Sequence, residues 1–343
     1  MRGLRIAAML AALVMAGAAP AQTGPKPLFA GSDILHLTIK GPINQIARSA
    51  QQSRVPHAAA ITVQGAAPET LPIQLSPRGI TRLRRETCQF PPLRVAFSSR
   101  PGPGSLFAGQ KRLKLVTHCR PAASFQQFLL LEYATYLVYN QLTPLSHRVR
   151  LATIDYVDDA DRPITTRFGF FLEDIDDVAA RNGLRSGATP DRISSSQLSS
   201  ADAARVALFE YMIGNMDWSM RAGPAGEGCC HNSHLLTRAG APALVPVPYD
   251  FDFSGLVDAP YAVSPDGNST VRQRHYMGFC RHNAEALAAA AAFRSQRGQL
   301  IAALNRAPLE ERTRQKAIAY LSTFYSDIAD DRSTAAKVLK TCG

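Results

Sequence analysis

Hydrophobic side chains recur at nearly every second position between residues 61 and 118. Alternation of this kind is typical of strands that bury one face against a core. The predicted strands are Ala60–Val63, Leu71–Leu75, Leu93–Phe97 and Arg112–His118. Turn-forming runs separate them, such as Pro101-Gly102-Pro103-Gly104. This stretch therefore predicts that the first half of the chain is built on an antiparallel sheet.

One helix and two further strands are predicted to complete this half. The helix runs from about Ala122 to Gln141, and its apolar face contains a carboxylate, Glu132, which needs a partner if it is buried. The strands are Arg148–Tyr156 and Thr165–Leu172, joined by a polar hairpin turn. An earlier strand is predicted over residues 34 to 40. The β-rich region is therefore expected to span residues 22 to 173.

Helical patterns dominate beyond this point, so residues 174 to 343 are expected to form a mainly helical region with active-site loops. The predicted elements are a short helix at Ile175–Ala180, a helix from the cap Ser199 to Ile213, strands at Ser233–Thr237 and Ala243–Tyr249, and helices over 283 to 306 and 308 to 330. Gly214 is in the position where a glycine ends a helix.

The first 21 residues have the pattern of a signal peptide. Arg2 and Arg5 precede a short apolar run, and Ala19-Pro20-Ala21 is a small-x-small cleavage site. No later segment is long and apolar enough to span a bilayer. We therefore expect an exported protein, periplasmic or secreted, with no stable membrane insertion after signal cleavage.

Six cysteines follow the predicted cleavage site: Cys88, Cys119, Cys229, Cys230, Cys280 and Cys342. An even number in an exported chain predicts up to three disulfides, with fifteen possible pairings. We expect the adjacent Cys229 and Cys230 to pair with different partners, because a bond between neighbours is strained. Two nearby histidines offer zinc as the alternative, which an oxidising compartment disfavours.

The formal net charge is +11 at pH 7. A basic exported protein can prefer anionic surfaces or polymers. Its basic residues are scattered, however, with few aromatic residues between them. Nucleic acid is therefore not an expected partner.

Residues that can carry chemistry concentrate between Tyr211 and Gly255. Asp217 follows the end of a predicted helix, and Asp250 and Asp252 follow the end of a predicted strand, with Asn232 between the two groups. Two acidic clusters and an amide at such positions suit a divalent cation and a phosphate-bearing substrate. Upstream, Lys114 on a strand precedes Glu132 by eighteen residues. Phosphoryl transfer from ATP needs one group of each of these kinds.

The chain resembles the CotH-like, or spore-coat kinase, branch of the protein-kinase-like superfamily, which also includes HipA-type and secreted Fam-type kinases. The resemblance covers roughly residues 70 to 260. It is carried by the segments K-R-L-K-L-V-T-H-C, F-L-L-L-E-Y, R-F-G-F-F-L-E-D-I-D-D, G-N-M-D-W-S, H-N-S-H-L-L and V-P-Y-D-F-D-F-S-G. It implies an α+β, bilobal protein-kinase-like fold, with an antiparallel-sheet N-lobe carrying one helix and a mainly helical C-lobe.

The resemblance also implies a role for each residue. Lys114 would bind phosphate and pair with Glu132, and Asp217 would be the catalytic-loop aspartate. Asn232 and Asp250 would hold Mg²⁺, with Mn²⁺ as the alternative, and Asp252 would be a second metal ligand or a structural carboxylate. The hinge over the adenine of ATP would run from Phe170 to Glu173. Arg78, in Ser76-Pro77-Arg78-Gly79, would contact phosphate in place of a full glycine-rich loop.

One departure from the family pattern is the loop of fourteen residues between Asp217 and Asn232, which is unusually long for a kinase.

We expect an exported kinase-like phosphotransferase that uses Mg-ATP to modify a protein or an envelope polymer. Transfer of AMP or glutamate is an open alternative to phosphoryl transfer. The second hypothesis is a catalytically inactive kinase-like fold that acts as an exported binding or structural module.

Overall fold

The computed structural model describes residues 24 to 343 except 188, 227, 266, 268 and 269, so the predicted signal peptide lies outside the described residues. Its first half is a closed barrel of seven strands. These are β1 (Leu35–Lys40), β2 (His57–Val63), β3 (Glu69–Pro77), β4 (Leu93–Phe97), β5 (Arg112–Val116), β6 (Val149–Val157) and β7 (Pro163–Leu172). The strand order around the barrel is β1-β2-β3-β4-β5-β7-β6.

The expected bilobal protein-kinase-like fold, with its antiparallel-sheet N-lobe, is wrong. The barrel is mixed, because β1 pairs antiparallel with β2 but parallel with β6, so that Leu37 lies opposite Ile154. This parallel pair joins two strands that would otherwise be edges of an open sheet, and closure removes both edges. The apolar side chains that alternate along the strands fill the barrel interior.

The second half contains a small sheet in addition to its helices. Its three strands are β8 (Leu184–Arg185), β9 (Ser233–Arg238) and β10 (Ala241–Pro248), in the order β10-β9-β8. The short helix α4 (Ile175–Arg181) packs on this sheet, and the two share a separate apolar cluster. The strands predicted at Ser233–Thr237 and Ala243–Tyr249 are present as β9 and β10, and β8 adds a short third strand.

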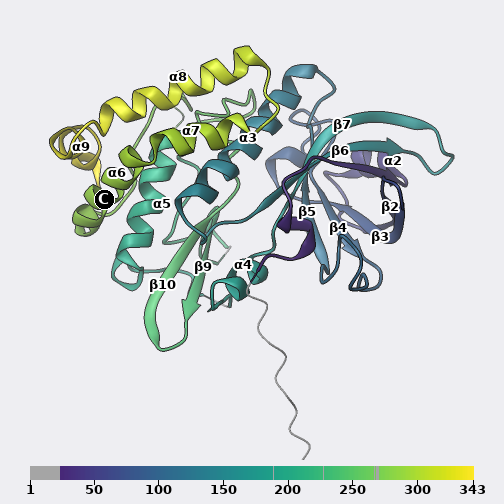
Figure 1. Ribbon diagram of the computed structural model, residues 1–343, viewed down its shortest axis with the longest axis horizontal. Coiled ribbons are helices and arrows are strands. Elements are labelled where there is room, and N and C mark those ends of the chain that lie inside the picture. Colours follow the sequence, from purple (N-terminus) through teal and green to yellow (C-terminus); the bar gives the residue numbers. More distant parts are fainter. Residues whose placement is uncertain (1–23, 188, 227, 266, 268–269) are drawn as a thin grey trace, which may run out of the picture.

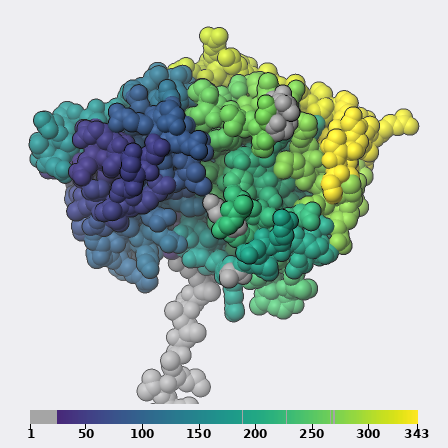
Figure 2. Space-filling view, turned by 180° about the vertical axis from the view of Figure 1, so that it is seen from behind, coloured from purple at the N-terminus to yellow at the C-terminus, as the bar shows by residue number. Residues whose placement is uncertain are grey.

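The remaining helices are α1 (Pro27–Ala30), α2 (Ile43–Ser49), α3 (Ala123–Leu142), α5 (Ser200–Ile213), α6 (Asn283–Ser295), α7 (Arg297–Asn305), α8 (Glu311–Asp327) and α9 (Asp331–Lys337). In Figure 1 the barrel occupies one side and α6 to α9 the other, with α3 between them. Figure 2 shows the same division on the opposite face. Within the described ranges, no helix is both long and apolar enough to cross a membrane.

Helix α3 contacts both halves and contributes to the largest core cluster, together with α5 and the carboxyl-terminal helices. The helix predicted for 283 to 306 is divided at Gln296, and the next helix begins at Glu311 rather than near 308. Ser199 precedes α5 as predicted, but its hydroxyl donates to Asp202 and caps no helix N–H.

Candidate functional site

The loop that follows α5 is fixed by the way this helix ends. Gly214 adopts a left-handed conformation with φ of 67°, and its N–H donates to the carbonyls of Glu210 and Tyr211. A Cβ at this position would collide with the Tyr320 hydroxyl, so only glycine fits. The predicted helix end is confirmed, and the chain turns directly into the segment that carries Asp217.

Asp217 is the centre of a hydrogen-bonded network. One carboxylate oxygen lies 2.7 Å from Nε2 of His231, and the other accepts from Nδ2 of Asn232 at 3.2 Å. The same amide donates to the Asp217 backbone carbonyl at 2.6 Å. The Asp217 side chain is 31% exposed and that of His231 33%, so the pair is held in place and reached by solvent. The fourteen-residue loop therefore returns to Asp217 rather than separating it from Asn232.

Asn232 and Asp250 are brought next to this network by the small sheet. The N–H of Tyr249 donates to the Asn232 carbonyl at 3.0 Å. Both Asn232 and Asp250 have positive φ, 48° and 67°, a conformation that Asn and Asp tolerate better than most residues. The Asp250 N–H also donates to the Tyr136 hydroxyl of α3 at 2.9 Å. Residues from α3, the loop after α5 and the end of β10 thus meet at one place.

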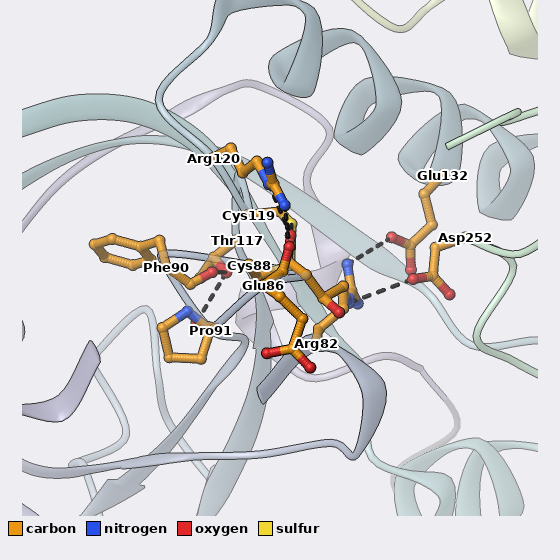
Figure 3. The surroundings of a disulfide bond; sticks show 11 residues. Arg82, Glu86, Cys88, Phe90, Pro91, Thr117, Cys119, Arg120, Glu132 and Asp252 are labelled. Atoms are coloured by element: carbon orange, nitrogen blue, oxygen red, sulfur yellow. Dashed lines mark hydrogen bonds and ion pairs between the residues drawn. A yellow bond between two sulfur atoms is a disulfide. The ribbon is translucent and has the colours of Figure 1, made fainter. Parts of the chain in front are cut away.

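A buried ionic cluster lies beside this meeting point. Arg82, from the 3₁₀ turn at Thr81–Leu83, lies 3.6 Å from a Glu132 oxygen and 3.3 Å from an Asp252 oxygen. Figure 3 shows Arg82 between the segment closed by the Cys88–Cys119 disulfide and these two carboxylates. All three side chains are at least nine-tenths buried. Neither sequence spacing nor the resemblance pointed to Arg82.

Burial controls protonation in this cluster. It raises the pKa of Glu132 well above its usual range and that of Asp252 to about 6, against the opposing field of Arg82. Burial would lower the pKa of Arg82, but the fields of Asp252, Tyr261 and Glu132 raise it overall. One guanidinium can balance only one carboxylate. The cluster therefore opposes the ionisation of both carboxyl groups at once.

The ion pair expected between Lys114 and Glu132 does not form among the described residues, because Glu132 is held by Arg82. Lys114 instead lies over the ring of Tyr249, 4.5 Å from its centroid. Tyr249 is in turn stacked on His234, at a centroid distance of 4.4 Å. Lys114 thus faces the strand that leads to Asp250 rather than the helix that carries Glu132.

Lys114 also lines a cavity of about 160 Å³ with Arg94, Arg112, Asp174 and His234. Arg94 lies directly opposite Lys114 on the neighbouring strand. Burial, followed by the field of Arg78, lowers the pKa of Lys114 to about 8, and the field of Asp250 acts against this shift. Arg78 is therefore part of the same electropositive region as Lys114 and Arg94. Positive charges this close to one another are unfavourable without an anion between them.

The two predicted hinge side chains are engaged elsewhere. Phe170 is fully buried, with its ring 5.8 Å from those of Tyr133 and Tyr136. Glu173 is 1% exposed and binds Arg181 through both carboxylate oxygens, at 3.0 Å each. These side chains cannot contact a nucleotide without rearrangement. Leu172 and Asp174, which alternate with them, line the cavity instead.

Among the described residues, no group of three or more His, Cys, Asp or Glu side chains could hold a metal ion by itself. The predicted metal ligands also differ in their surroundings. Asp252 is 4% exposed and paired with Arg82, whereas Asp250 is half-buried and has no such ion pair in the described structure. Asp250 and Asn232 are therefore the residues best placed for a cation.

The expectation for Cys229 and Cys230 is wrong. The structure pairs these neighbours with each other. The other four cysteines form the disulfides Cys88–Cys119 and Cys280–Cys342. The peptide between the two neighbours is cis. This pair immediately precedes His231, the residue that contacts Asp217 and that sequence reasoning noted only as a possible zinc ligand. The only signal was that His231 directly precedes Asn232, which the resemblance placed in the same site as Asp217.

Comparison with known proteins returned neither a matching family model nor a matching curated protein. The chemistry available to this protein is that of the residues that the fold brings together. These are Asp217 with His231 and Asn232, Asp250 beside them, and the cationic region around Lys114.

Proposed function

We propose that this protein is an exported phosphotransferase that uses Mg-ATP to modify a hydroxyl group on a protein or an envelope polymer. The observation that carries the proposal is the Asp217 carboxylate, which is oriented by His231 and Asn232 and yet 31% exposed. A general base must be fixed in place and within reach of the proton that it accepts. The proposal rests on this local chemistry and on the resemblance of the motifs.

The region around Lys114 supports the binding of a phosphate-rich ligand. Lys114, Arg94 and Arg78 have no ion pair among the described side chains, and their charges oppose one another. A triphosphate would relieve this repulsion. Because the field of Asp250 reaches Lys114, the phosphates and the acidic residues would share one site.

The residues fit Mg²⁺, and Mn²⁺ as the alternative, in the kind of donor that they offer. Both ions prefer oxygen ligands, and Asp250 supplies a carboxylate. The Nδ2 of Asn232 is turned to Asp217, which leaves its amide oxygen for a cation. Asp252 fits less well, because Arg82 already binds it. A bound cation would neutralise charge on the phosphates.

In the proposed reaction, the acceptor hydroxyl gives its proton to Asp217 as its oxygen forms a bond to the terminal phosphorus. The bond from that phosphorus to the leaving ADP oxygen breaks. His231 holds one oxygen of Asp217 and Asn232 donates to the other, which would still have a lone pair for the proton of the hydroxyl. Lys114 offsets charge on the phosphates. Transfer of AMP or glutamate would need the same nucleotide site, with a different bond broken.

A second candidate is an inactive binding or structural module. The observation that favours it is the engagement of Glu132 by Arg82, which leaves Lys114 without a carboxylate partner in the described structure. Scarcity of ATP outside the cytoplasm favours it as well. Such a module would bind nucleotide or its partner without transfer.

Two measurements on four proteins separate these candidates. The proteins are the wild type, Asp217→Asn, Asp250→Ala and the control Asp159→Asn, which changes an exposed aspartate in the β6–β7 turn. We expect Mg-ATP to raise the melting temperature of the wild type and the control but not of Asp250→Ala. We expect label from γ-³²P-ATP to reach an envelope-protein mixture with the wild type and the control only.

The outcomes have distinct meanings. Binding of Mg-ATP without transfer by any of the proteins would replace the enzyme with the binding module. Absence of a melting shift in the wild type, with no change in Asp250→Ala, would reject both a nucleotide site and the proposed reaction. Transfer that survives in Asp217→Asn would remove Asp217 from the mechanism.

A further inference from the structure

Helix α3 also lines a second cavity, of about 270 Å³, which is separate from the site described above. Glu132 and Tyr136 face Arg82 and Asp250, whereas Tyr133, Leu137 and Asn140 line the second cavity. These two sets occupy neighbouring faces of the helix, because residues three or four apart lie above one another. The remaining walls come from α1, the loop before β6, α4 and the end of α7.

The charged residues that line this cavity are all arginines: Arg148, Arg181 and Arg306. Arg181 is neutralised by Glu173, which it binds at 3.0 Å. The side chains of Arg148 and Arg306 have no ion pair among the described residues. Among the residues that the structure describes, no aspartate or glutamate lines this cavity. The wall therefore carries uncompensated positive charge.

A third cation lies behind the wall. Arg150 is 6% exposed, and its Nε and Nη1 have no hydrogen-bond partner in the described structure. Its guanidinium lies against Gly31, where even a Cβ would collide with Nη1, and Gly31 is itself part of the cavity wall. Burial lowers the pKa of Arg150, and the field of Asp33 acts against this shift. Asp33 is exposed, however, and forms no ion pair with Arg150 in the described structure. A buried guanidinium without hydrogen-bond partners is costly, and an anion in the neighbouring cavity would offset its charge through the wall.

The loop beside these arginines is rigidly held. Nδ2 of Asn140 donates to the Ser146 hydroxyl at 3.0 Å and to the His147 carbonyl at 2.8 Å. The Ser146 hydroxyl donates to the Thr143 carbonyl at 2.8 Å. The wall is thus formed before any ligand arrives, which lowers the cost of binding.

We propose that this cavity binds a small dianionic ligand, a phosphate monoester, through Arg148 and Arg306, with the buried charge of Arg150 behind the wall adding to the attraction. Guanidinium groups suit phosphate because their planar forks donate pairs of hydrogen bonds. The cavity has room for a phosphate and a short hydroxylated body, which Ser146 and Gln141 can contact. The site brings together α1, the barrel and α7, so its occupancy joins the two halves of the molecule.

The test is calorimetric titration of the full-length mature protein with inorganic phosphate and with glycerol 3-phosphate, and with acetate as the singly charged comparison. The variants are Arg150→Gln, Arg148→Gln and Arg306→Gln. The control is Arg312→Gln, an exposed arginine of α8 outside this wall. Lys114→Met is included because phosphate could also enter the first site. Circular dichroism checks that each variant is folded.

We expect both phosphates to bind the wild type, Arg312→Gln and Lys114→Met with equal affinity at this site. Arg148→Gln and Arg306→Gln should each bind about tenfold more weakly, as loss of one charged hydrogen-bonding group predicts, and Arg150→Gln should also bind more weakly because a buried positive charge is lost. Acetate should bind more weakly than phosphate. If Arg150→Gln is unfolded, the two exposed arginines decide the result. Absence of saturable phosphate binding, or equal affinity in the cavity variants and Arg312→Gln, would overturn the proposal.

Discussion

Two clusters that contain aspartates lie side by side in this molecule and differ mainly in burial. Asp252 is buried with Arg82 and Glu132, whereas Asp217 and its partner His231 are each about one-third exposed. In the buried cluster, loss of solvent raises the pKa of both carboxyl groups. In the exposed network, protons can exchange with water. The difference in burial fits a structural role for the first cluster and the proposed chemical role for the second.

The connection between the clusters is short, since Phe251 alone separates Asp250 from Asp252. Phe251 is fully buried and packs against Tyr136 and Phe209. This packing fixes the segment, so that one of its aspartates points into the ionic cluster while the other remains beside Asn232. A change in the buried cluster should therefore alter the site by moving Asp250, in addition to changing the electrostatic field that Asp252 and Asp250 exert on each other.

The largest effect is expected for Arg82→Met. It leaves Glu132 and Asp252 buried without a cation, and such a loss typically costs about 3–5 kcal/mol. The free energy of unfolding from urea titration measures it. Combining Arg82→Met with Glu132→Gln should recover part of the loss, because one buried carboxylate is then removed. An Arg82→Met protein as stable as the wild type would show that the cluster is not structural.

A smaller effect is expected from pH. The pKa of Asp252 is raised from its usual 3.8 to about 6 in the folded protein, so the folded state holds a proton that the unfolded state releases earlier. The raised pKa of Asp252 therefore adds fully to the free energy of unfolding below pH 4, and this contribution is lost as the pH rises through 6. The difference in unfolding free energy between wild type and Asp252→Asn should change by about 1–3 kcal/mol over this range. A difference independent of pH would contradict the raised pKa.

Local patterns in the sequence predicted much of the secondary structure. The strand Leu93–Phe97 has the predicted bounds, and α3 begins and ends within one residue of the predicted helix. Gly214 ends α5 as predicted, because its conformation is a local property of the backbone. Alternation and turn residues act over a few positions, and these are the features that they can fix.

Closure of the barrel could not be predicted in this way. It depends on β1 pairing with β6, more than a hundred residues later, and alternation says nothing about which strands pair. Arg82 was missed for a related reason. It lies in a short 3₁₀ turn without periodicity, and only the fold brings it to Glu132. His231 was separated from Asp217 by the long loop, whose return the sequence does not reveal.

The smallest effect on stability, and the sharpest test of the comparison, is expected for His231→Gln. Its pair with Asp217 is about one-third exposed on both sides, and such pairs typically contribute less than about 1 kcal/mol. If Asp217 is the proposed base, the substitution should nevertheless lower label transfer about tenfold or more, because the carboxylate is no longer oriented. Urea unfolding and transfer assays on the same preparation measure both quantities. A loss of stability as large as that of Arg82→Met would make the two clusters alike, and burial would no longer explain their difference.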